Sequence, residues 1–321
     1  MLDNDQLLHL LNRHSSSGVS GAMLGEVLGV SRVTVQKRIQ ALVDNGLPIK
    51  AVPGVGYMLP EGVSILNEQD LRANLNVAQV SDISVLQNVG STNSYLLGRA
   101  IHQSLGSLCV TESQAAGRGR RGNDWQSKPY RNVMMSLSWG FSRWPETITG
   151  LGLAVALVVC EHLREQFEVD VHIKWPNDLL VNDRKLAGVL IDVAGEASSA
   201  CNVVIGLGLN VHQPDWSTDG AYEWQDLAGL GVQCDRNVLI AGLTDKLVSM
   251  LQDFERDGFS PLMRRWHALS TFSERRIKVI GGDGINEGVM AGVDSMGALL
   301  LRGDDEQIHR FTDSNVSVRL V

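Results

Sequence analysis

Residues 20–42 read SGAMLGEVLGVSRVTVQKRIQAL, and this stretch decides the fold of the first part of the chain. Ser20 and Ser31 each precede an amphipathic segment, and serine is a preferred residue at the start of a helix. Gly29 lies between the two segments and predicts a tight turn. The second segment repeats apolar residues at helical spacing, which predicts one buried face: Val35, Ile39 and Leu42. The pattern predicts a helix-turn-helix.

The other side of the second predicted helix is polar. We expect it to contact DNA through six residues: Ser31, Arg32, Thr34, Gln36, Lys37 and Gln40. Leucines within residues 7–11 predict a further helix in front, and residues 49–57 (IKAVPGVGY) predict a β-hairpin behind, which completes a winged helix-turn-helix. A three-helix bundle with a solvated polar face is the alternative to DNA binding.

The charge distribution separates this segment from the rest of the chain. The 321 residues carry a formal net charge of −8, and residues 1–60 contain five Lys or Arg against four Asp or Glu, which leaves −9 for the remainder. An anionic body repels DNA at long range, so any DNA contact must come from the N-terminal segment. With 44% hydrophobic and 20% charged residues, the composition is that of a globular protein of two or three domains.

Signals for export or membrane insertion are not found in the sequence. The first residues are acidic and no apolar leader follows them, and the longest apolar run, residues 151–160, is shorter than the roughly 18 residues of a membrane span. The four cysteines have neither paired nor CxxC spacing, which favours reduced thiols over a disulfide frame or a zinc site. We therefore expect a cytoplasmic protein with no membrane segment.

Residues 63–271 alternate between strand-like and helix-like segments. Strands are predicted at 83–86, 108–111, 133–139, 171–174, 188–193 and 203–209, and long helices at 147–166 and 237–256. Five shorter strands separated by turns are predicted at 276–280, 285–293, 298–302, 307–311 and 316–320. We expect an α+β multidomain chain: a winged helix-turn-helix at 1–62, a mixed α/β domain of catalytic size at 63–271 and a C-terminal SH3-like β-barrel at 272–321.

Two stretches carry unusual chemistry. Residues 117–122 (GRGRRG) combine arginines, which grip carboxylates or phosphates, with glycines, which let the backbone approach a ligand. This combination predicts a lid over an anionic intermediate, and an RNA-binding or disordered loop is the alternative. Residues 174–178 (KWPND) place a lysine at the end of a strand, and a surface hairpin with a solvated lysine accounts for the same spacing.

Two other motifs are less specific. Ser91-Thr92-Asn93 precedes a helix, where capping is the usual explanation. Gly206-Leu207-Gly208 follows a strand but lacks the third glycine of a dinucleotide-binding loop. The sequence contains no GxxxxGK[ST], HExxH or GxSxG motif, which excludes P-loop NTPases, zincins and nucleophile-elbow hydrolases.

Together, in this order and behind a winged helix, the motifs STN, GRGRRG, KWPND and GLGLN resemble biotin protein ligases of the bifunctional BirA type. The resemblance covers nearly the whole chain and implies a central domain similar to class II aminoacyl-tRNA synthetases. It implies that biotin attacks the α-phosphate of ATP, with Mg²⁺, to give biotinyl-5′-AMP. Biotin would then pass to a lysine of the biotin carboxyl carrier protein of acetyl-CoA carboxylase. It also implies repression at biotin operon operator DNA by a homodimer that forms when the adenylate is bound.

The resemblance also implies roles for individual residues. The catalytic residues would be Lys174, Arg118 and Arg120, with Lys174 between the biotin carboxylate and the α-phosphate. The biotin-binding residues would be Ser91, Thr92, Asn93, Gln114, Gly117, Arg118, Gly119, Arg120 and Lys174. The residues on the nucleotide side would be Arg121, Trp125, Asn210, Tyr222 and Trp224. No metal ligands are predicted. Two other functions fit part of the pattern: a ligand-sensing repressor without ligase activity, and a lipoate-type protein ligase.

Overall fold

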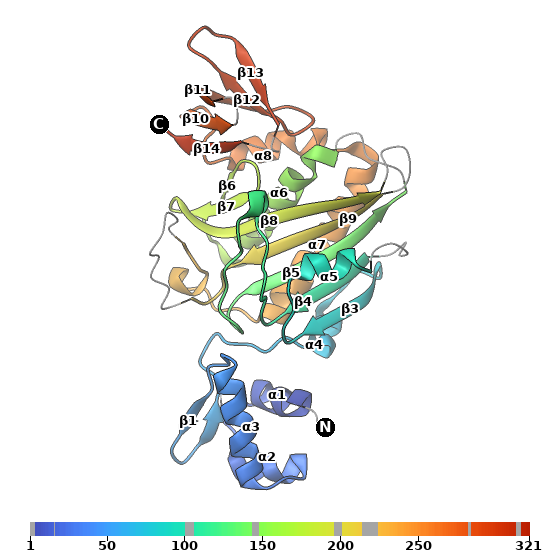
Figure 1. The fold of residues 1–321 in the computed structure, drawn as a ribbon, viewed down its shortest axis with the longest axis vertical. Helices are drawn as coiled ribbons and strands as arrows, with labels where there is room; N and C mark the ends of the chain where they lie inside the picture. Colours follow the sequence, from blue (N-terminus) through green and yellow to red (C-terminus); the bar gives the residue numbers. More distant parts are fainter. Residues whose placement is uncertain are drawn as a thin grey trace.

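The computed structural model describes residues 4–15, 17–99, 106–142, 148–195, 201–213, 224–281, 284–312 and 316–321. Three regions follow one another along the long axis of the molecule (Figure 1): N-terminal helices, a large mixed sheet and a small C-terminal sheet. This arrangement confirms the α+β multidomain architecture, whereas the boundaries at 62 and 271 stay predictions.

The N-terminal region is a winged helix-turn-helix. Its elements are α1 (Asn4–Arg13), α2 (Gly21–Leu28), α3 (Arg32–Asp44), β1 (Lys50–Val52) and β2 (Gly56–Met58). Ser20 and Ser31 cap α2 and α3, and each side chain accepts a hydrogen bond of 3.1 Å from the backbone of the third residue after it. Gly29 ends α2 in the left-handed conformation, with φ of 62°. The predicted inward residues of α3 are all buried: Val35, Ile39 and Leu42.

The central sheet has seven strands in the order β3-β4-β5-β9-β8-β7-β6. They are β3 (Val80–Leu86), β4 (Gly106–Thr111), β5 (Val133–Phe141), β6 (His172–Lys174), β7 (Asp178–Val181), β8 (Arg184–Gly195) and β9 (Cys201–Leu209). Strands β3 and β4 are parallel, and the other neighbours are antiparallel. The six predicted strands are confirmed. Strand β7 was not predicted, because it begins inside the KWPND motif, whose proline and asparagine are turn residues.

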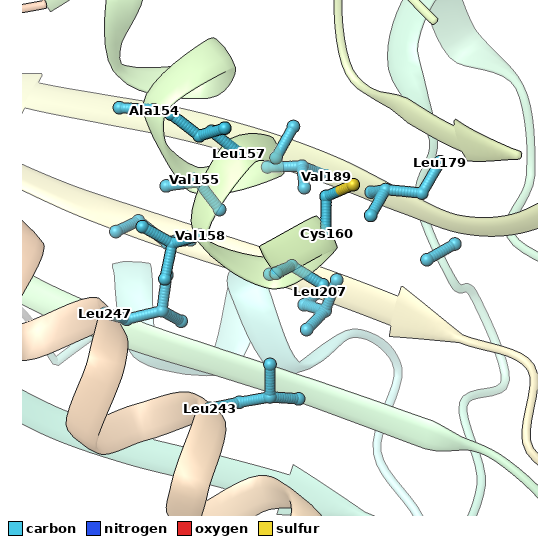
Figure 2. Packing of buried hydrophobic residues seen from close by; sticks show 14 of the residues in the cluster. Ala154, Val155, Leu157, Val158, Cys160, Leu179, Val189, Leu207, Leu243 and Leu247 are labelled. Atoms are coloured by element: carbon cyan, nitrogen blue, oxygen red, sulfur yellow. The ribbon is translucent and has the colours of Figure 1, made fainter. Parts of the chain in front are cut away.

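Helices α6 (Leu151–Phe167) and α7 (Arg236–Asp257) cover one face of this sheet (Figure 1), and both were predicted. Figure 2 shows how side chains of α6 and α7 pack against Val189 of β8 and Leu207 of β9. Because side chains alternate along a strand, the residues next to Val189 and Leu207 face the opposite side. The short helix α5 (Thr92–Leu97) packs there, through the apolar cluster of Leu96, Cys109 and Val204. Helices α4 (Glu68–Asn74) and α8 (Met263–Leu269), of seven residues each, were not predicted.

The C-terminal region is a five-stranded antiparallel sheet in the order β13-β12-β11-β10-β14. Its strands are β10 (Arg276–Gly281), β11 (Gly284–Val293), β12 (Leu299–Arg302), β13 (Ile308–Phe311) and β14 (Ser317–Leu320), as predicted. No pairing joins β13 to β14 among the described residues. Trp175 of the KWPND motif donates a 3.0 Å hydrogen bond from its indole nitrogen to the carbonyl of Gly297. The turn between β11 and β12 of the C-terminal region therefore contacts one of the predicted site motifs directly.

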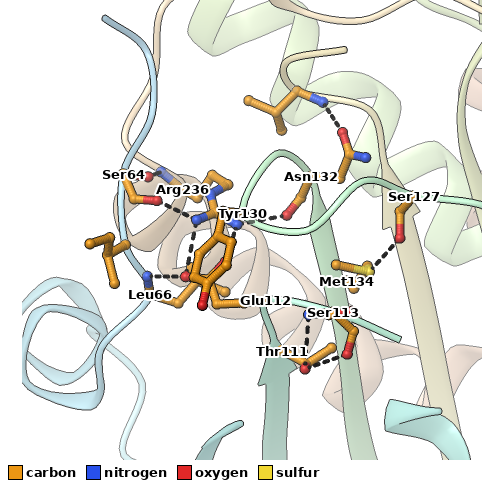
Figure 3. A network of polar contacts seen from close by, with 12 residues as sticks. Ser64, Leu66, Thr111, Glu112, Ser113, Ser127, Tyr130, Asn132, Met134 and Arg236 are labelled. Atoms are coloured by element: carbon orange, nitrogen blue, oxygen red, sulfur yellow. Dashed lines mark hydrogen bonds and ion pairs between the residues drawn. The ribbon is translucent and has the colours of Figure 1, made fainter. Parts of the chain in front are cut away.

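A buried ion pair joins the start of the central region to its sheet and to α7 (Figure 3). Glu112 and Arg236 are 0% and 1% exposed, and the carboxylate Oε2 lies 2.7 Å from Arg236 Nη1. Glu112 Oε1 also accepts a 2.7 Å hydrogen bond from the backbone of Leu66, and Arg236 donates to the carbonyls of Ser64 and Asn132. The pair thus fixes the segment that leaves the winged helix.

Three structural observations concern the predictions about membrane segments, cysteines and metal ligands. Among the described residues no helix is both long and apolar enough to cross a membrane. The four cysteines are free, and burial raises the pKa of the Cys109 and Cys160 thiols to about 12 each. The described part of the chain also contains no cluster of three or more metal-ligating side chains.

Candidate active site

The sheet face away from α6 and α7 carries glycines in its centre. Gly206 and Gly208 of β9 stand opposite Leu190 and Gly188 of β8 on this face. A Cβ atom at Gly206 would lie 2.3 Å from Asn93 Oδ1, and one at Gly208 would lie 2.3 Å from Cε2 of Trp125. The GLGLN motif therefore serves the close approach of two side chains to the strand, which explains its glycines without a dinucleotide.

Above these glycines lies a network of neutral polar groups. Ser91 caps α5, as expected, and the three residues Ser91, Thr92 and Asn93 are buried. Gln114 Oε1 accepts a 2.9 Å hydrogen bond from the backbone nitrogen of Thr92 and lies 3.2 Å from Thr92 Oγ1. Ser136 Oγ on β5 lies 2.7 Å from Thr92 Oγ1 and donates a 2.5 Å hydrogen bond to Asn93 Oδ1. The predicted biotin residues 91–93 and 114 are thus brought together, and Ser136 joins them.

The network ends on a charged group that the sequence analysis did not identify. Asn93 Nδ2 donates a 2.8 Å hydrogen bond to Asp192 Oδ2 on β8, and the same oxygen accepts from Arg118 Nη2. Both polar atoms of the Asn93 amide are therefore held by protein groups. Ser136 and Asp192 lie inside strands, without a flanking motif, so only the register of β5, β8 and β9 reveals them.

The arginine-glycine segment forms an ordered loop over this face. Its ends meet through a 2.9 Å hydrogen bond from the backbone of Trp125 to the carbonyl of Gly117, and Gly119 donates to the carbonyl of Asn123. Arg120 Nη1 lies 3.2 Å from Asn177 Oδ1 of the KWPND motif. A cavity of about 710 Å³ lies between the loop and β8, lined by Arg118, Gly119, Arg120, Arg121, Gly122, Asn123, Asp124, Leu190, Ile191 and Asp192. These contacts favour the predicted lid over the alternative of a disordered loop.

Two lysines flank Asp178 at the edge of the site. Lys174, the predicted catalytic lysine, is opposite Asp178 in the β6–β7 pair, and its Nζ lies 6.0 Å from the ring centre of Phe272. Burial lowers the pKa of Lys174, and the neighbouring Asp178 carboxylate opposes that shift. Lys185, which we did not predict as a site residue, lies 2.6 Å from Asp178 Oδ1, and a Cβ at Gly188 would lie 3.2 Å from its Nζ. Lys185 therefore extends over the glycine-lined face.

Aromatic rings close the side of the site that is expected to hold the nucleotide. Trp125 meets Trp224 edge to face, with ring centres 5.8 Å apart, and Lys185 Nζ lies 5.7 Å from the Trp125 ring centre. Tyr222, also predicted on the nucleotide side, lies outside the described residues. Asn210 is fully buried, and its Nδ2 donates to the carbonyls of Lys185 and Gln225 at 3.2 and 3.1 Å. These bonds fix the chain around Lys185, and a direct contact of Asn210 with nucleotide stays a prediction.

The comparisons with known proteins agree with this geometry. Residues 85–210 match the model of the biotin/lipoate A/B protein ligase family, residues 4–58 match an HTH domain, and residues 272–319 match the biotin protein ligase C terminal domain. The bifunctional ligase/repressor BirA of Salmonella typhimurium is 41% identical over 286 residues, which cover 89% of this chain and 88% of that protein. The chain belongs to the biotin/lipoate A/B protein ligase family.

Other members of this ligase family match over similar lengths. The bifunctional ligase/repressor BirA of Bacillus subtilis is 28% identical over 308 residues, covering 93% of this chain and 94% of that protein. The biotin protein ligase from Aquifex aeolicus, solved in complex with biotin and ATP, superimposes with a TM-score of 0.64 at 24% identity, over 75% of this chain and 100% of that one. That similarity shows a shared fold over three quarters of this chain.

The N-terminal region of this ligase-family chain presents part of the predicted DNA-contacting set to solvent. Arg32, Gln36 and Lys37 are exposed on α3. Ser31 and Thr34 are bonded to each other at 2.9 Å, and the exposed Gln40 donates a 2.8 Å hydrogen bond to Asp44. Ser31 and Thr34 therefore organise the start of α3, while the remaining residues form its polar surface.

Proposed function

We propose that this chain is a bifunctional biotin protein ligase and repressor. It activates biotin with ATP to biotinyl-5′-AMP, transfers biotin to a lysine of the biotin carboxyl carrier protein of acetyl-CoA carboxylase, and represses biotin synthesis genes from the cytoplasm. The supporting observation is the site itself, in which a neutral polar pocket around Gln114 and a group of cations around Lys185 share one glycine-lined sheet face. The similarity to bifunctional ligase/repressors over 89% of the chain supports both activities.

The neutral end of the site suits the ureido ring of biotin, which is uncharged and carries both donors and an acceptor. Gln114 accepts through Oε1 within the network. Its Nε2 donates no hydrogen bond among the described residues, so the Nε2 amide can donate to the ureido carbonyl. Ser91 and Thr92 supply hydroxyls beside it. Asn93 has both amide atoms engaged by Ser136 and Asp192, so its role is to hold the pocket rather than to contact the ring.

The cationic end suits the adenylation step. The biotin carboxylate oxygen forms a bond to the α-phosphorus of ATP, and the bond to the bridging oxygen breaks, so that pyrophosphate leaves with its electron pair. Negative charge crowds between the two reactants, and a fixed ammonium stabilises it. Lys185 extends over the glycine face beside Trp125, whereas Lys174 lies toward Phe272 and the C-terminal region. We therefore assign the reacting centre to Lys185 and place Lys174 at its margin.

The arginine loop and Mg²⁺ would act on the phosphates. Arg118, Arg120 and Arg121 line the cavity of about 710 Å³, where they would neutralise phosphate oxygens and keep water from the mixed anhydride. Because the described residues offer no ready-made metal cluster, a Mg²⁺ ion entering with ATP would take most ligands from phosphates and water. In the second step the carrier lysine amine attacks the anhydride carbonyl, AMP leaves and an amide forms.

Repression would use α3 in the major groove of operator DNA. A single unit with few cations neutralises few phosphates, so a homodimer that forms with bound adenylate would place two copies of α3 on a two-fold operator. The exposed Arg32 is the residue to test. Arg32→Ala should weaken binding to a palindromic biotin operator and leave biotin transfer unchanged, as measured by filter binding and by transfer assays on one preparation.

One experiment separates this proposal from its alternatives. The protein is incubated with ATP, Mg²⁺, a carrier domain and either biotin or lipoate, and the mass of the carrier is measured. A biotin-sized increase supports the ligase, and a lipoate-sized increase alone would assign the chain to lipoate attachment. An unmodified carrier together with biotin-dependent operator binding would identify a sensor without ligase activity.

A further inference from the structure

Asp192 joins the two ends of the site through a single oxygen atom. Its Oδ2 accepts from Asn93 Nδ2 at 2.8 Å on the side of the neutral pocket, and from Arg118 Nη2 on the side of the loop. The Asp192 side chain is 25% exposed and that of Arg118 is 40% exposed, so the pair lies at the mouth of the cavity rather than in the core. Within the described residues, Asp192 is the only side chain that binds the Arg118 guanidinium.

The neutral pocket cannot shift without moving Asp192. Asn93 is held between Ser136, which donates to its Oδ1, and Asp192, which accepts from its Nδ2. A Cβ at Gly206 would lie 2.3 Å from Asn93 Oδ1, so the strand below fixes the height of the amide as well. The position of the Asp192 carboxylate is therefore set by the pocket, and Arg118 takes its position from that carboxylate.

We propose that Asp192 is a positioning residue that couples the biotin-ring pocket to the arginine loop. When the ring pocket is ordered by its ligand, the carboxylate stays in the place where it holds Arg118, and the loop stays closed over the adenylate. The effect is reciprocal, because coupling between two sites acts equally in both directions. The inference rests on the proposed function, since it uses biotin and biotinyl-AMP as the ligands of the two ends.

Substitutions at position 192 separate the two contacts. Asp192→Asn keeps an oxygen that can accept from Asn93 but has no charge to hold Arg118, whereas Asp192→Ala removes both contacts. Asp192→Glu keeps the charge on a longer side chain. Two quantities are measured for each variant: the dissociation constant of biotin without ATP, and the release rate of biotinyl-AMP made from biotin and ATP. Asp304→Asn, which removes the partner of Arg276 on the exposed C-terminal sheet, is the matched control.

The expected result is a split between the two measurements. Asp192→Asn should bind biotin within about twofold of wild type and release biotinyl-AMP about tenfold faster, within the range typical of coupled sites. Asp192→Ala should also weaken biotin binding, and Asp192→Glu should restore slow release better than Asn. Arg118→Gln should release the adenylate at least as fast as Asp192→Asn, because it also removes a phosphate contact. The double variant should be no faster than Arg118→Gln, because the Asp192 change then has no Arg118 contact left to break.

Other results overturn the inference. It fails if Asp192→Asn changes neither quantity, if it changes both by the same factor as Asp192→Ala, or if the Arg118 and Asp192 effects multiply. A loss of thermal stability without the split indicates a purely structural role and also contradicts it. If wild-type protein neither binds biotin nor makes biotinyl-AMP, the proposed function fails instead, and the wild-type measurement reveals this before any variant is compared.

Discussion

The indole ring of Trp125 lies directly on the backbone of Gly208, so close that a Cβ at position 208 would come within 2.3 Å of Trp125 Cε2. This contact joins the end of the arginine loop to the strand beneath the site. Trp125 in turn meets Trp224, and its ring centre lies 5.7 Å from Lys185 Nζ. The glycine at position 208 therefore affects the placement of both tryptophan rings and of the Lys185 ammonium.

Gly208→Ala should displace Trp125 and open the nucleotide side of the site. Overfilling a packed contact costs about 1–3 kcal/mol. Here the new Cβ would meet Trp125, so the loop should shift while the core of the sheet stays in place. We expect weaker ATP binding with biotin binding retained, measured by titration calorimetry and by tryptophan fluorescence. Gly152→Ala on α6 is the control, because its new Cβ would meet only Ile191 at an ordinary 3.8 Å. Unchanged ATP affinity in Gly208→Ala would contradict the prediction.

Lys185→Met should abolish most adenylation, while Lys174→Met should reduce it less. Removing one fixed stabilising group from a reacting centre typically costs about 2.7–4 kcal/mol, or roughly 10²–10³ in rate. The measurement is pyrophosphate release from biotin and ATP at saturating substrate. Both variants keep an unbranched side chain, one atom shorter, and remove its charge. A larger loss in Lys174→Met would return the reacting centre to Lys174, the lysine that the family resemblance implied.

Arg236→Met should destabilise the whole central region. The substitution leaves the fully buried Glu112 carboxylate without its partner, and breaking a buried pair in this way costs about 3–5 kcal/mol. Urea unfolding monitored by circular dichroism measures the loss. The double variant Arg236→Met/Glu112→Gln should recover part of it, because no buried charge is left unpaired. Arg276→Met, which breaks an exposed pair with Asp304, should change the free energy of unfolding little.

The stability of the protein should fall below about pH 6.5 because of His162 on α6. This side chain is 8% exposed, and burial lowers its pKa, with Lys246 adding to the effect and Glu165 opposing it. The folded state therefore keeps the imidazole neutral at a pH where the unfolded chain is protonated, so protons favour unfolding. His162→Gln should lose less free energy of unfolding between pH 7.5 and pH 5.5 than wild type. Equal losses in wild type and His162→Gln would refute this account.

Local patterns predicted most of the fold. The helix caps Ser20 and Ser31 and the strands of the C-terminal sheet depend on neighbouring residues, so their sequence signals are strong. Helix α8 has only two turns, too few to show a helical period, and strand β7 begins inside the KWPND motif, whose proline and asparagine are turn residues. Tertiary packing decides both elements.

The candidate site was predicted where motifs mark it and missed where only the register does. Gln114 and Arg118 lie in or beside conspicuous loops, and the structure brings them to one face. Ser136, Lys185 and Asp192 lie on strands whose pairing brings them to the same face from distant parts of the chain. Which of Lys174 and Lys185 lies at the reacting centre depends on the direction in which each side chain extends, and only the folded sheet determines that direction.

The long reach of the Asn93–Asp192 contact has a consequence for the newly made chain. The two residues are 99 positions apart, whereas the helices and the hairpin of the DNA-reading unit all lie within residues 4–58. Protein domains made on the ribosome fold as units from the N-terminus, and distant pairings form more slowly than near ones. A ribosome-bound chain should therefore complete the winged helix-turn-helix well before the Asn93–Asp192 contact of the proposed biotin pocket can form. Fragments ending before residue 192 should fold their first 58 residues but should not bind biotin.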